Sequence, residues 1–356
     1  MKKILVLSAG GPASLSYCRS LRLANKNVEL HGADSDVFNL FRAETDFKLI
    51  TPKHSDKSFE EFIIKYITAN KIDFLHPQSE ADVYKIGLMR DKLTEFGCKT
   101  FLPSQREIEL FRDKGKSYQL WNKAGITVPK NLFINNVGDL RNAFEFFGKD
   151  IWLRETIGAA GKGSLSRPTF EEALALIETN KSWGRVVAAT HLTSDTVTWQ
   201  SVWYKGELYA SQGRRRLNWA FGNRSQSGVT GLTGVGETYN SASLSELAQK
   251  CIKAANAMPH GIYSVDFTYD VHGTPNPTEI NIGKFFTTHM FLSTVGANMP
   301  AQVFDLVFEE EKPAKLIDLC PDNMFWVRGI DVEPKLVSKD EIEVLMQTFL
   351  NTKAQF

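Results

Sequence analysis

The chain has 356 residues, 42% of them hydrophobic and 23% charged, with a formal net charge of +1. This length allows two or three subdomains around a well-buried core. The near-neutral charge argues against nucleic acid as a partner, because a polyanion requires a strongly basic surface. No apolar run approaches the length of about 18 residues that spans a bilayer, so we expect no membrane partner.

The N-terminus and the cysteines both indicate a reducing compartment. Met1 and two lysines lead directly into a short apolar strand instead of a secretory hydrophobic segment, which predicts a cytoplasmic protein. The four cysteines are scattered without a CxxC pair, at Cys18, Cys98, Cys251 and Cys320. This pattern favours reduced, buried thiols over disulfides or a thiolate metal site.

Residues 1–112 alternate apolar strands with helical patterns. We expect strands at Ile4–Ser8, Val28–Gly32, Phe47–Ile50, Asp73–His76 and Lys99–Leu102, and a helix over Glu80–Glu95. Such alternation builds parallel βαβ units, so the region is predicted to be a doubly wound α/β domain. A nucleotide phosphate suits the turn at Gly10 and Gly11, beside a helix N-terminus. Asp34 keeps a dinucleotide oxidoreductase open as an alternative, but the GxGxxG motif is absent.

A glycine-rich loop marks the next region. A helix from Arg112 to Lys123 ends at the sequence AGITVP, and the strand Asp150–Glu155 leads into Gly158–Ser164, with the sequence GAAGKGS. Three glycines among small residues expose backbone amides and let a ligand approach closely, which is a common way to hold phosphates. The lysine of the Walker A motif is missing from its required place, which disfavours a P-loop enzyme. A hairpin turn without a ligand is the alternative interpretation.

After Arg185, short strands separated by tight turns predict an antiparallel sheet. Its first strands are expected at Val186–Ala189, Thr196–Tyr204 and Glu207–Gln212. The arginines 214–216 follow, and they predict either a solvated strand end or a site for carboxylate or phosphate. Because alternate side chains share a face, Arg214 and Arg216 are expected to face the same acid. Gly222–Gly236 is predicted to be a loop that orders over substrate.

The stretch Ser264–Asn281 has the pattern of a β-hairpin with its turn at Asp270–Asn276. Asp266, Glu279 and Asn281 then project to one side, since side chains two apart share a face. Two carboxylates and an amide oxygen suit Mg²⁺ or Mn²⁺ better than zinc. A solvated polar face is the alternative interpretation of the same spacing.

In this order, the motifs resemble the ATP-grasp superfamily, and within it the branch similar to the large subunit of carbamoyl-phosphate synthase. The resemblance runs from Ile4 to about Pro300 and rests on four features. They are the AGGPA turn, Asp113-Lys114 opening a helix that ends in AGITVP, a basic strand residue before GAAGKGS, and Asp266 with Glu279-x-Asn281.

The resemblance implies the domain organisation. It predicts an N-terminal α/β pre-grasp domain at 1–112 and a small lid at 113–185 that carries the glycine-rich loop. An antiparallel β platform is predicted at 186–310, and a C-terminal strand and helix at 311–356 are predicted to pack on it. ATP is expected between the lid and the platform.

The resemblance also implies site residues. The expected nucleotide-binding residues are Lys114, Arg154, Gly158, Ala160, Gly161, Lys162, Gly163, Ser164, Val187, Thr190, Leu192 and Asp195. Among these, Lys114 and Arg154 are expected to hold phosphates, and Asp195 is the nearest match to an acid that contacts ribose. Asp266, Glu279 and Asn281 match the family's Mg²⁺ or Mn²⁺ ligands. The sequence departs from the family in lacking a glutamate in the hinge at residues 188–191.

The implied reaction joins a small carboxylate to an amine or ammonia at the expense of ATP. The carboxylate attacks the γ-phosphate, and the amine then displaces phosphate from the acylphosphate. The residues expected to act in catalysis are Arg154, Lys284, Arg214 and Arg216, with Lys284 in the place of a family arginine. A carboxylate or carbamate kinase-like enzyme and a non-catalytic nucleotide-binding regulator are alternatives, and a homodimer is possible.

Three further residues remain open between a substrate contact and a structural role. Glu80 follows a predicted strand end and suits either an amine or the N-terminus of its own helix. His289 and Arg328 are interpreted as packed residues or as substrate contacts.

Overall fold

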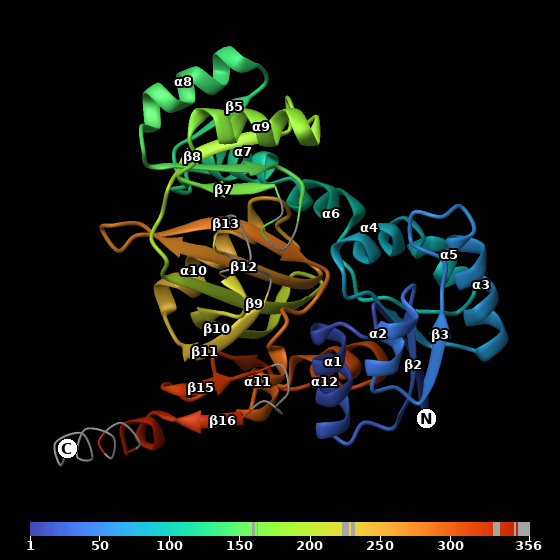
Figure 1. Ribbon diagram of the computed structural model, residues 1–356. Coiled ribbons are helices and arrows are strands. Elements are labelled where there is room, and N and C mark those ends of the chain that lie inside the picture. Colours follow the sequence, from blue (N-terminus) through green and yellow to red (C-terminus); the bar gives the residue numbers. More distant parts are fainter. Residues whose placement is uncertain are drawn as a thin grey trace, which may run out of the picture.

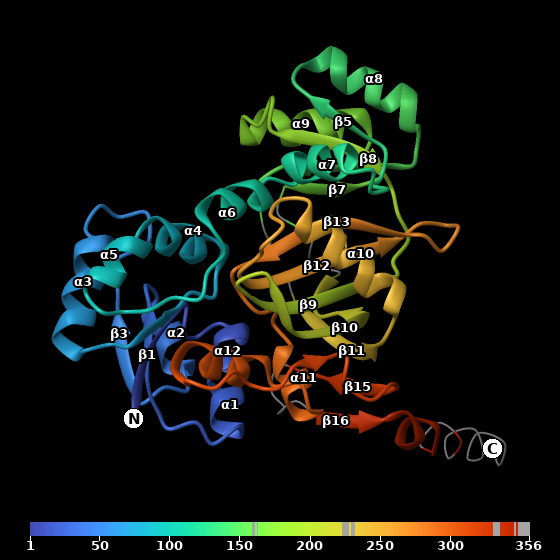
Figure 2. The same ribbon diagram turned by 180° about the vertical axis from the view of Figure 1, so that it is seen from behind.

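Three sheets organise the protein in the computed structural model, which describes residues 1–158, 161, 163–222, 228, 232–329, 335–344 and 347. Figures 1 and 2 show a small sheet with its helices at one end, a large sheet in the middle, and a parallel sheet with its helices beside the large one. This arrangement matches the predicted order of an α/β domain followed by two antiparallel units. No helix of the described residues combines the length and apolarity needed to cross a bilayer.

The parallel sheet contains β1 (Lys2–Leu7), β2 (Val28–Asp34), β3 (Phe47–Ile50) and β4 (Phe74–His76), in the order β3-β2-β1-β4. Both faces are covered. Ile4 and Val6 pack in the core shared with α1 (Pro12–Leu23) and α12 (Met299–Phe308), whereas Leu5 and Leu7 pack in the core shared with α3 (Phe59–Asn70). The predicted doubly wound domain is therefore confirmed. The strand order changes direction between β1 and β4, because β2 and β3 follow β1 on one side and β4 lies on the other. The carboxyl ends of β1 and β4 therefore form a crevice that suits a ligand.

Three predictions for the N-terminal region are wrong in detail. The helix expected over Glu80–Glu95 is two helices, α4 (Glu80–Leu88) and α5 (Arg90–Glu95). The strand expected at Lys99–Leu102 is a single bridge between Lys99 and Phe74. The helix expected from Arg112 is preceded by α6 (Gln105–Arg112) and begins as α7 (Lys114–Lys123), because the Asp113 carboxylate caps it by accepting from the Gly115 and Lys116 amides. A short helix, α2 (Val37–Arg42), lies beside β2 and β3.

The small sheet has the order β5-β8-β6-β7 and is antiparallel, with β5 (Asn131–Ile134), β6 (Ile151–Glu155), β7 (Ser164–Ser166) and β8 (Val186–Thr190). The helices α8 (Val137–Phe147) and α9 (Phe170–Asn180) cover it and share a separate apolar core with it. The glycine-rich loop joins β6 to β7. The domain boundaries at 112, 185 and 310 stay predictions.

The large sheet has the order β13-β12-β9-β10-β11-β15-β16. Its strands are β9 (Thr196–Tyr204), β10 (Glu207–Trp219), β11 (Thr233–Tyr239), β12 (Gly261–Tyr269), β13 (Pro275–Ile282), β15 (Met324–Val327) and β16 (Lys335–Ser338), and β14 (Leu316–Ile317) pairs with β10. One face packs on α10 (Ala242–Lys253) through an apolar core that includes Trp199 and Val265. The opposite face carries polar side chains toward the small sheet.

Two predictions for this region are corrected. The three arginines lie inside β10, which extends to Trp219, and not at a solvated strand end. The loop expected at Gly222–Gly236 is already strand β11 from Thr233, and most of residues 223–231 fall outside the described residues. Of the helix predicted within residues 311–356, residues 339–344 are helical. α11 (His289–Thr294) follows β13 and packs against α1.

A buried aromatic stack joins the parallel sheet to the segment after β13. The rings of Tyr17 and His76 stack with centroids 3.9 Å apart, and Phe285 lies 4.8 Å from the ring of His289. The Gln78 amide links the two sides, because it pairs with His76 and donates to the Phe285 carbonyl. His289 is therefore a packed residue, bonded through Nδ1 to the Phe286 carbonyl.

We expect this stack to make the fold sensitive to acid. Burial lowers the pKa of His289 to about 4 and that of His76 to about 3. As pH falls below the unfolded pKa of about 6.5, the unfolded chain binds a proton that the folded protein does not bind. The free energy of unfolding therefore decreases until pH reaches the folded pKa. His289→Asn should therefore reduce the loss in free energy of unfolding between pH 6.5 and 4 by about 3 kcal/mol. Urea unfolding at both pH values measures this, with exposed His272→Asn as the control. Equal losses in His289→Asn and in the parent would contradict it.

Candidate active site

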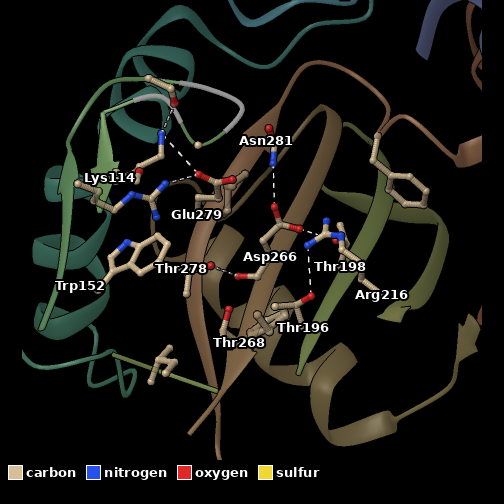
Figure 3. Close-up of a pocket in the computed structure, with 18 of the residues that line it drawn as sticks. Lys114, Trp152, Thr196, Thr198, Arg216, Asp266, Thr268, Thr278, Glu279 and Asn281 are labelled. Atoms are coloured by element: carbon tan, nitrogen blue, oxygen red, sulfur yellow. Dashed lines mark hydrogen bonds and ion pairs between the residues drawn. The ribbon is translucent and has the colours of Figure 1, made fainter. Parts of the chain in front are cut away.

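A cleft of about 550 Å³ lies between the small sheet, the polar face of the large sheet, and the crevice end of the parallel sheet. Charged residues from all three units line it. They are Glu80, Arg112, Lys114, Arg154, Glu155, Arg214, Arg216, Asp266, Glu279 and Lys284. Figure 3 shows Lys114, Arg216, Asp266 and Glu279 among them. The cleft thus brings together most of the residues that the sequence marked as candidates.

The β12–β13 hairpin places its three predicted ligands on one face. In the strand register, Asp266 lies opposite Glu279, and Ser264 lies opposite Asn281. Asn281 Nδ2 donates to Asp266 Oδ2 at 3.0 Å, and Thr198 on the neighbouring strand donates to Asp266 Oδ1. The alternate residues Val265 and Ile280 are buried in the core behind the sheet. The predicted common face is therefore present, because the period of two separates polar from apolar side chains.

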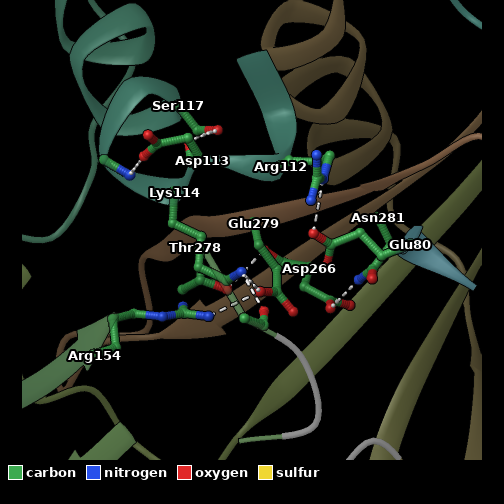
Figure 4. A network of polar contacts seen from close by, with 12 residues as sticks. Glu80, Arg112, Asp113, Lys114, Ser117, Arg154, Asp266, Thr278, Glu279 and Asn281 are labelled. Atoms are coloured by element: carbon green, nitrogen blue, oxygen red, sulfur yellow. Dashed lines mark hydrogen bonds and ion pairs between the residues drawn. The ribbon is translucent and has the colours of Figure 1, made fainter. Parts of the chain in front are cut away.

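Two cations from the small-sheet side converge on Glu279 (Figure 4). Arg154 Nη2 donates to Glu279 Oε2 at 2.8 Å, and Lys114 Nζ lies 3.5 Å from the same oxygen. β6 positions Arg154, while the capped start of α7 positions Lys114. Burial alone raises the pKa of Glu279, but the Lys114, Arg154 and Lys284 charges outweigh burial and hold it far below its ordinary value. The carboxylate is therefore ionised at neutral pH.

The oxygen donors on this face fit a hard divalent cation. Arg154 and Lys114 both contact Oε2 of Glu279, and Asn281 bonds to Asp266 through its Nδ2. Within the described residues, Oε1 of Glu279 and Oδ1 of Asn281 accept no hydrogen bond, so both oxygens are available to a cation. No group of three or more His, Cys, Asp or Glu side chains suited to a metal occurs in the described part of the chain. Two carboxylates and an amide match Mg²⁺, which is usually held by few protein ligands plus nucleotide phosphates.

The glycine-rich loop is tied to the phosphate side of the cleft. Lys114 Nζ donates to the Gly158 carbonyl at 2.8 Å, and Gly158, Gly161 and Ser164 line the cleft. Gly163 has a φ of +70°, and a Cβ there would lie 2.9 Å from the Glu155 side chain, so glycine is required at this turn. The predicted residues Ala160 and Lys162 lie outside the described residues.

The opposite end of the cleft is lined by the hinge that joins β8 to β9. Thr190 and Leu192 line it as predicted. Val187 is buried in the apolar core instead, and Asp195 forms an ion pair of 3.3 Å with Arg215 and is not a lining residue. Sequence reasoning missed Trp152, which lies two residues before Arg154 on β6 and faces the cleft beside Glu279 and Thr278 (Figure 3). Trp152 could have been predicted from the strand period of two, because residues 152 and 154 of the same strand face the same side.

Arg214 and Arg216 face the cleft from β10. Arg214 is 1% exposed and donates to the hydroxyls of Thr198, Thr233 and Thr288. Arg216 donates to the hydroxyls of Thr196 and Thr233, and its guanidinium lies 3.6 Å from the centre of the Trp219 ring. Burial is the main cause that lowers the pKa of both arginines.

The remaining candidates differ in their surroundings. Lys284 lines the cleft and forms no ion pair within the described residues. Glu80 pairs with Arg112 Nε at 3.1 Å, and Arg112 in turn stacks on Tyr84 at 4.1 Å, so Glu80 already has a cationic partner. Arg328 donates to the Thr287 carbonyl next to the cleft.

No family model matches the sequence, and no curated protein matches it. The fold, however, is similar to solved structures. The biotin carboxylase domain dimer of Hydrogenobacter thermophilus 2-oxoglutarate carboxylase, with MgADP, ADP and bicarbonate, gives a TM-score of 0.70 at 16% identity over 92% of this chain and 73% of that chain. The Campylobacter jejuni biotin carboxylase–β-γ-ATP complex gives a TM-score of 0.70 at 16% identity, over 92% of this chain and 74% of that chain.

Staphylococcus aureus N5-carboxyaminoimidazole synthetase with ADP gives a TM-score of 0.68 at 15% identity over 92% of this chain and 82% of that chain. At such low identity the likeness establishes the fold. Together with the order of the sequence motifs, it shows that the chain has the ATP-grasp fold.

Proposed function

We propose that the protein is an ATP-dependent ligase that joins a small carboxylic acid to an amine or ammonia through an acylphosphate. The observation that carries the proposal is the pair of cations, Lys114 and Arg154, held over Glu279 next to Asp266 and Asn281. Solved structures of the same fold hold ADP, MgADP or an ATP analogue. In this chain, ATP lies between the small and large sheets with its base toward Trp152 and the hinge.

The chain's own residues bind and neutralise the reacting phosphate. Phosphoryl transfer requires positioning and charge stabilisation more than covalent help from the protein. Lys114 and Arg154 contact the phosphates from the small-sheet side, and Lys284 faces the transferred phosphate. Asp266, Glu279 and Asn281 would hold Mg²⁺, which would supply further positive charge to the reacting phosphates.

The acid substrate lies at the arginine end of the cleft. Its carboxylate is held by Arg214 and Arg216, and one carboxylate oxygen attacks the γ-phosphorus as the bond to the ADP oxygen breaks. The amine nitrogen then attacks the acyl carbon and loses a proton, and phosphate leaves with the former carboxylate oxygen. The carboxylate is already ionised, so no side chain has to act as a base in the first step. The glycine-rich loop excludes water from the acylphosphate.

The experiment is to measure ADP and phosphate release with Mg-ATP across a panel of small acids, each with and without an amine or ammonia. We expect release to require both an acid and a nitrogen donor. Release with acid alone would replace the ligase by a carboxylate kinase-like enzyme. Binding of ATP without release on any pair would favour a nucleotide-binding regulator. A homodimer and a cytoplasmic location stay predictions.

A further inference from the structure

A patch of exposed apolar side chains lies at the edge of the parallel sheet, where β3 is the last strand. It is formed by β3 together with α2, which packs against β2 and β3. We call it the edge patch, and none of its residues lines the cleft. The patch residues and their exposed fractions are Val37 (41%), Phe38 (77%), Phe41 (76%), Phe47 (50%) and Ile50 (57%).

The core of the protein does not account for these side chains. α2 is anchored by Leu40, which is buried in a small core with Ala9 and Ala43. Phe38 and Phe41 are three positions apart, so they share a face of the helix, and both are exposed there. The apolar face that they form therefore has no partner among the described residues.

The edge patch is large for a surface that faces only water. A phenylalanine side chain has about 200 Å² to bury, so the three phenylalanines alone expose about 400 Å². The largest apolar patch of a monomer is about 300 to 600 Å² and is often functional. A stable interface buries about 800 Å² on each partner, and a little more than half of this area is apolar. With Val37 and Ile50, the edge patch supplies the apolar part of one such face.

The backbone edge of β3 is also accessible. β3 pairs with β2 on one side, and within the described residues no strand pairs with its other side. Proteins commonly protect such an edge with a lysine that projects from it. Here Lys48 Nζ donates to the Phe41 carbonyl at 3.3 Å and lies 6.0 Å from the centre of the Phe41 ring. The lysine is thus directed onto α2 and leaves the strand edge open.

The two ends of the edge patch carry opposite charges. Asp34 and Asp36 lie where β2 ends and α2 begins, whereas Arg42 ends α2 and Lys48 lies near the start of β3. Their side-chain hydrogen bonds go to residues of the same segment, and Lys53, beyond β3, forms no ion pair with either acid. The two acids between α2 and β3 already pair with arginines of α1. One end of the patch is therefore acidic and the other basic.

We propose that the edge patch is the contact between two copies of this chain related by a two-fold axis. In such a contact the same surface occurs on both partners and must be complementary to itself. The two-fold axis places the acidic end of one copy against the basic end of the other, and the phenylalanines meet between these ends. This charge complementarity favours a second copy over an unrelated protein. The inference does not depend on the proposed function, because the patch and the cleft share no residue.

The test is sedimentation velocity of the full chain at about 1 to 100 μM, since interfaces of this size have dissociation constants in the micromolar range or below. We expect a dimer. Phe38→Asp and Phe41→Asp should each raise its dissociation constant about thirtyfold or more, because each places a charge in the centre of the apolar contact. Phe146→Asp is the matched control, since Phe146 is 59% exposed on α8 and lies outside the patch. It should leave the dissociation constant unchanged.

Hydrogen exchange of the parent protein tests the same surface without a substitution. Amides of residues 37–50 should exchange more slowly at high than at low protein concentration, and amides of α8 should exchange at the same rate at both. A parent protein that stays monomeric throughout the concentration range would overturn the inference. A dimer that persists unchanged in folded Phe38→Asp and Phe41→Asp, or one without concentration-dependent protection of residues 37–50, would also overturn it.

Discussion

Glu279→Gln should lower ATP-dependent turnover by about two to three orders of magnitude, the usual loss when a group that organises transition-state charge is removed. The amide keeps the size of the side chain but removes the charge that attracts Lys114 and Arg154 and would hold Mg²⁺. Both cations remain able to bind phosphate, so ATP binding should weaken less than turnover. Steady-state kinetics and nucleotide binding on the same preparation separate the two effects.

The matched control is Glu60→Gln, which removes a carboxylate on α3 from a partly exposed ion pair with Lys92 on α5. It should leave turnover within a factor of two of the parent value, as is usual for a surface pair. Circular dichroism and thermal unfolding confirm that both variants are folded. A folded Glu279→Gln protein with undiminished turnover would reject the metal and phosphate assignment of the hairpin.

Arg214→Gln should raise the KM for the acid by about ten- to a hundredfold and change the KM for ATP little, because hydrogen bonds to charged groups contribute about 1.5 to 3 kcal/mol. Arg214 is buried against three threonine hydroxyls and has no carboxylate partner within the described residues. The substitution removes one of the cations that offset the buried Asp266 carboxylate, and it removes hydrogen bonds to three threonine hydroxyls, so stability should also fall, by about 1 to 3 kcal/mol. Thermal unfolding of the variant separates this loss of stability from the effect on substrate binding.

Kinetics at varied acid and saturating ATP, and then the reverse, measure this effect. Arg167→Gln is a suitable comparison, since it removes a guanidinium from an exposed pair with Asp150 outside the cleft. A rise in the KM for ATP larger than that for the acid would move Arg214 to the nucleotide.

Local patterns allowed the fold and much of the candidate site to be predicted. The alternation of Val265, Asp266 and Phe267 separates a buried face from a polar one, so the side of the hairpin that faces the cleft follows from the period of two. Asp113 marks the start of α7 because an aspartate cap requires only the amides two and three residues after it, here those of Gly115 and Lys116. The parallel sheet followed from βαβ alternation, which its register confirms.

Features that depend on contacts between distant segments could not be predicted in this way. β10 continues through Arg214 because β9 and β11 pair with it on both sides. The sequence of residues 214–216 alone does not indicate either pairing. The pairing of Glu80 with Arg112 joins residues 32 positions apart, so the sequence left Glu80 available for an amine. Arg328 approaches Arg214 only through the fold of the segment after β13.

The most direct test of the central claim is oxygen transfer from the acid to phosphate. A substrate identified in the release assay is labelled with ¹⁸O in its reacting carboxylate, and the phosphate formed with Mg-ATP and amine is analysed by mass spectrometry. An acylphosphate requires that each phosphate carry one oxygen from the carboxylate, so we predict one ¹⁸O per phosphate. Phosphate without label, released together with the ligated product, would contradict the acylphosphate mechanism.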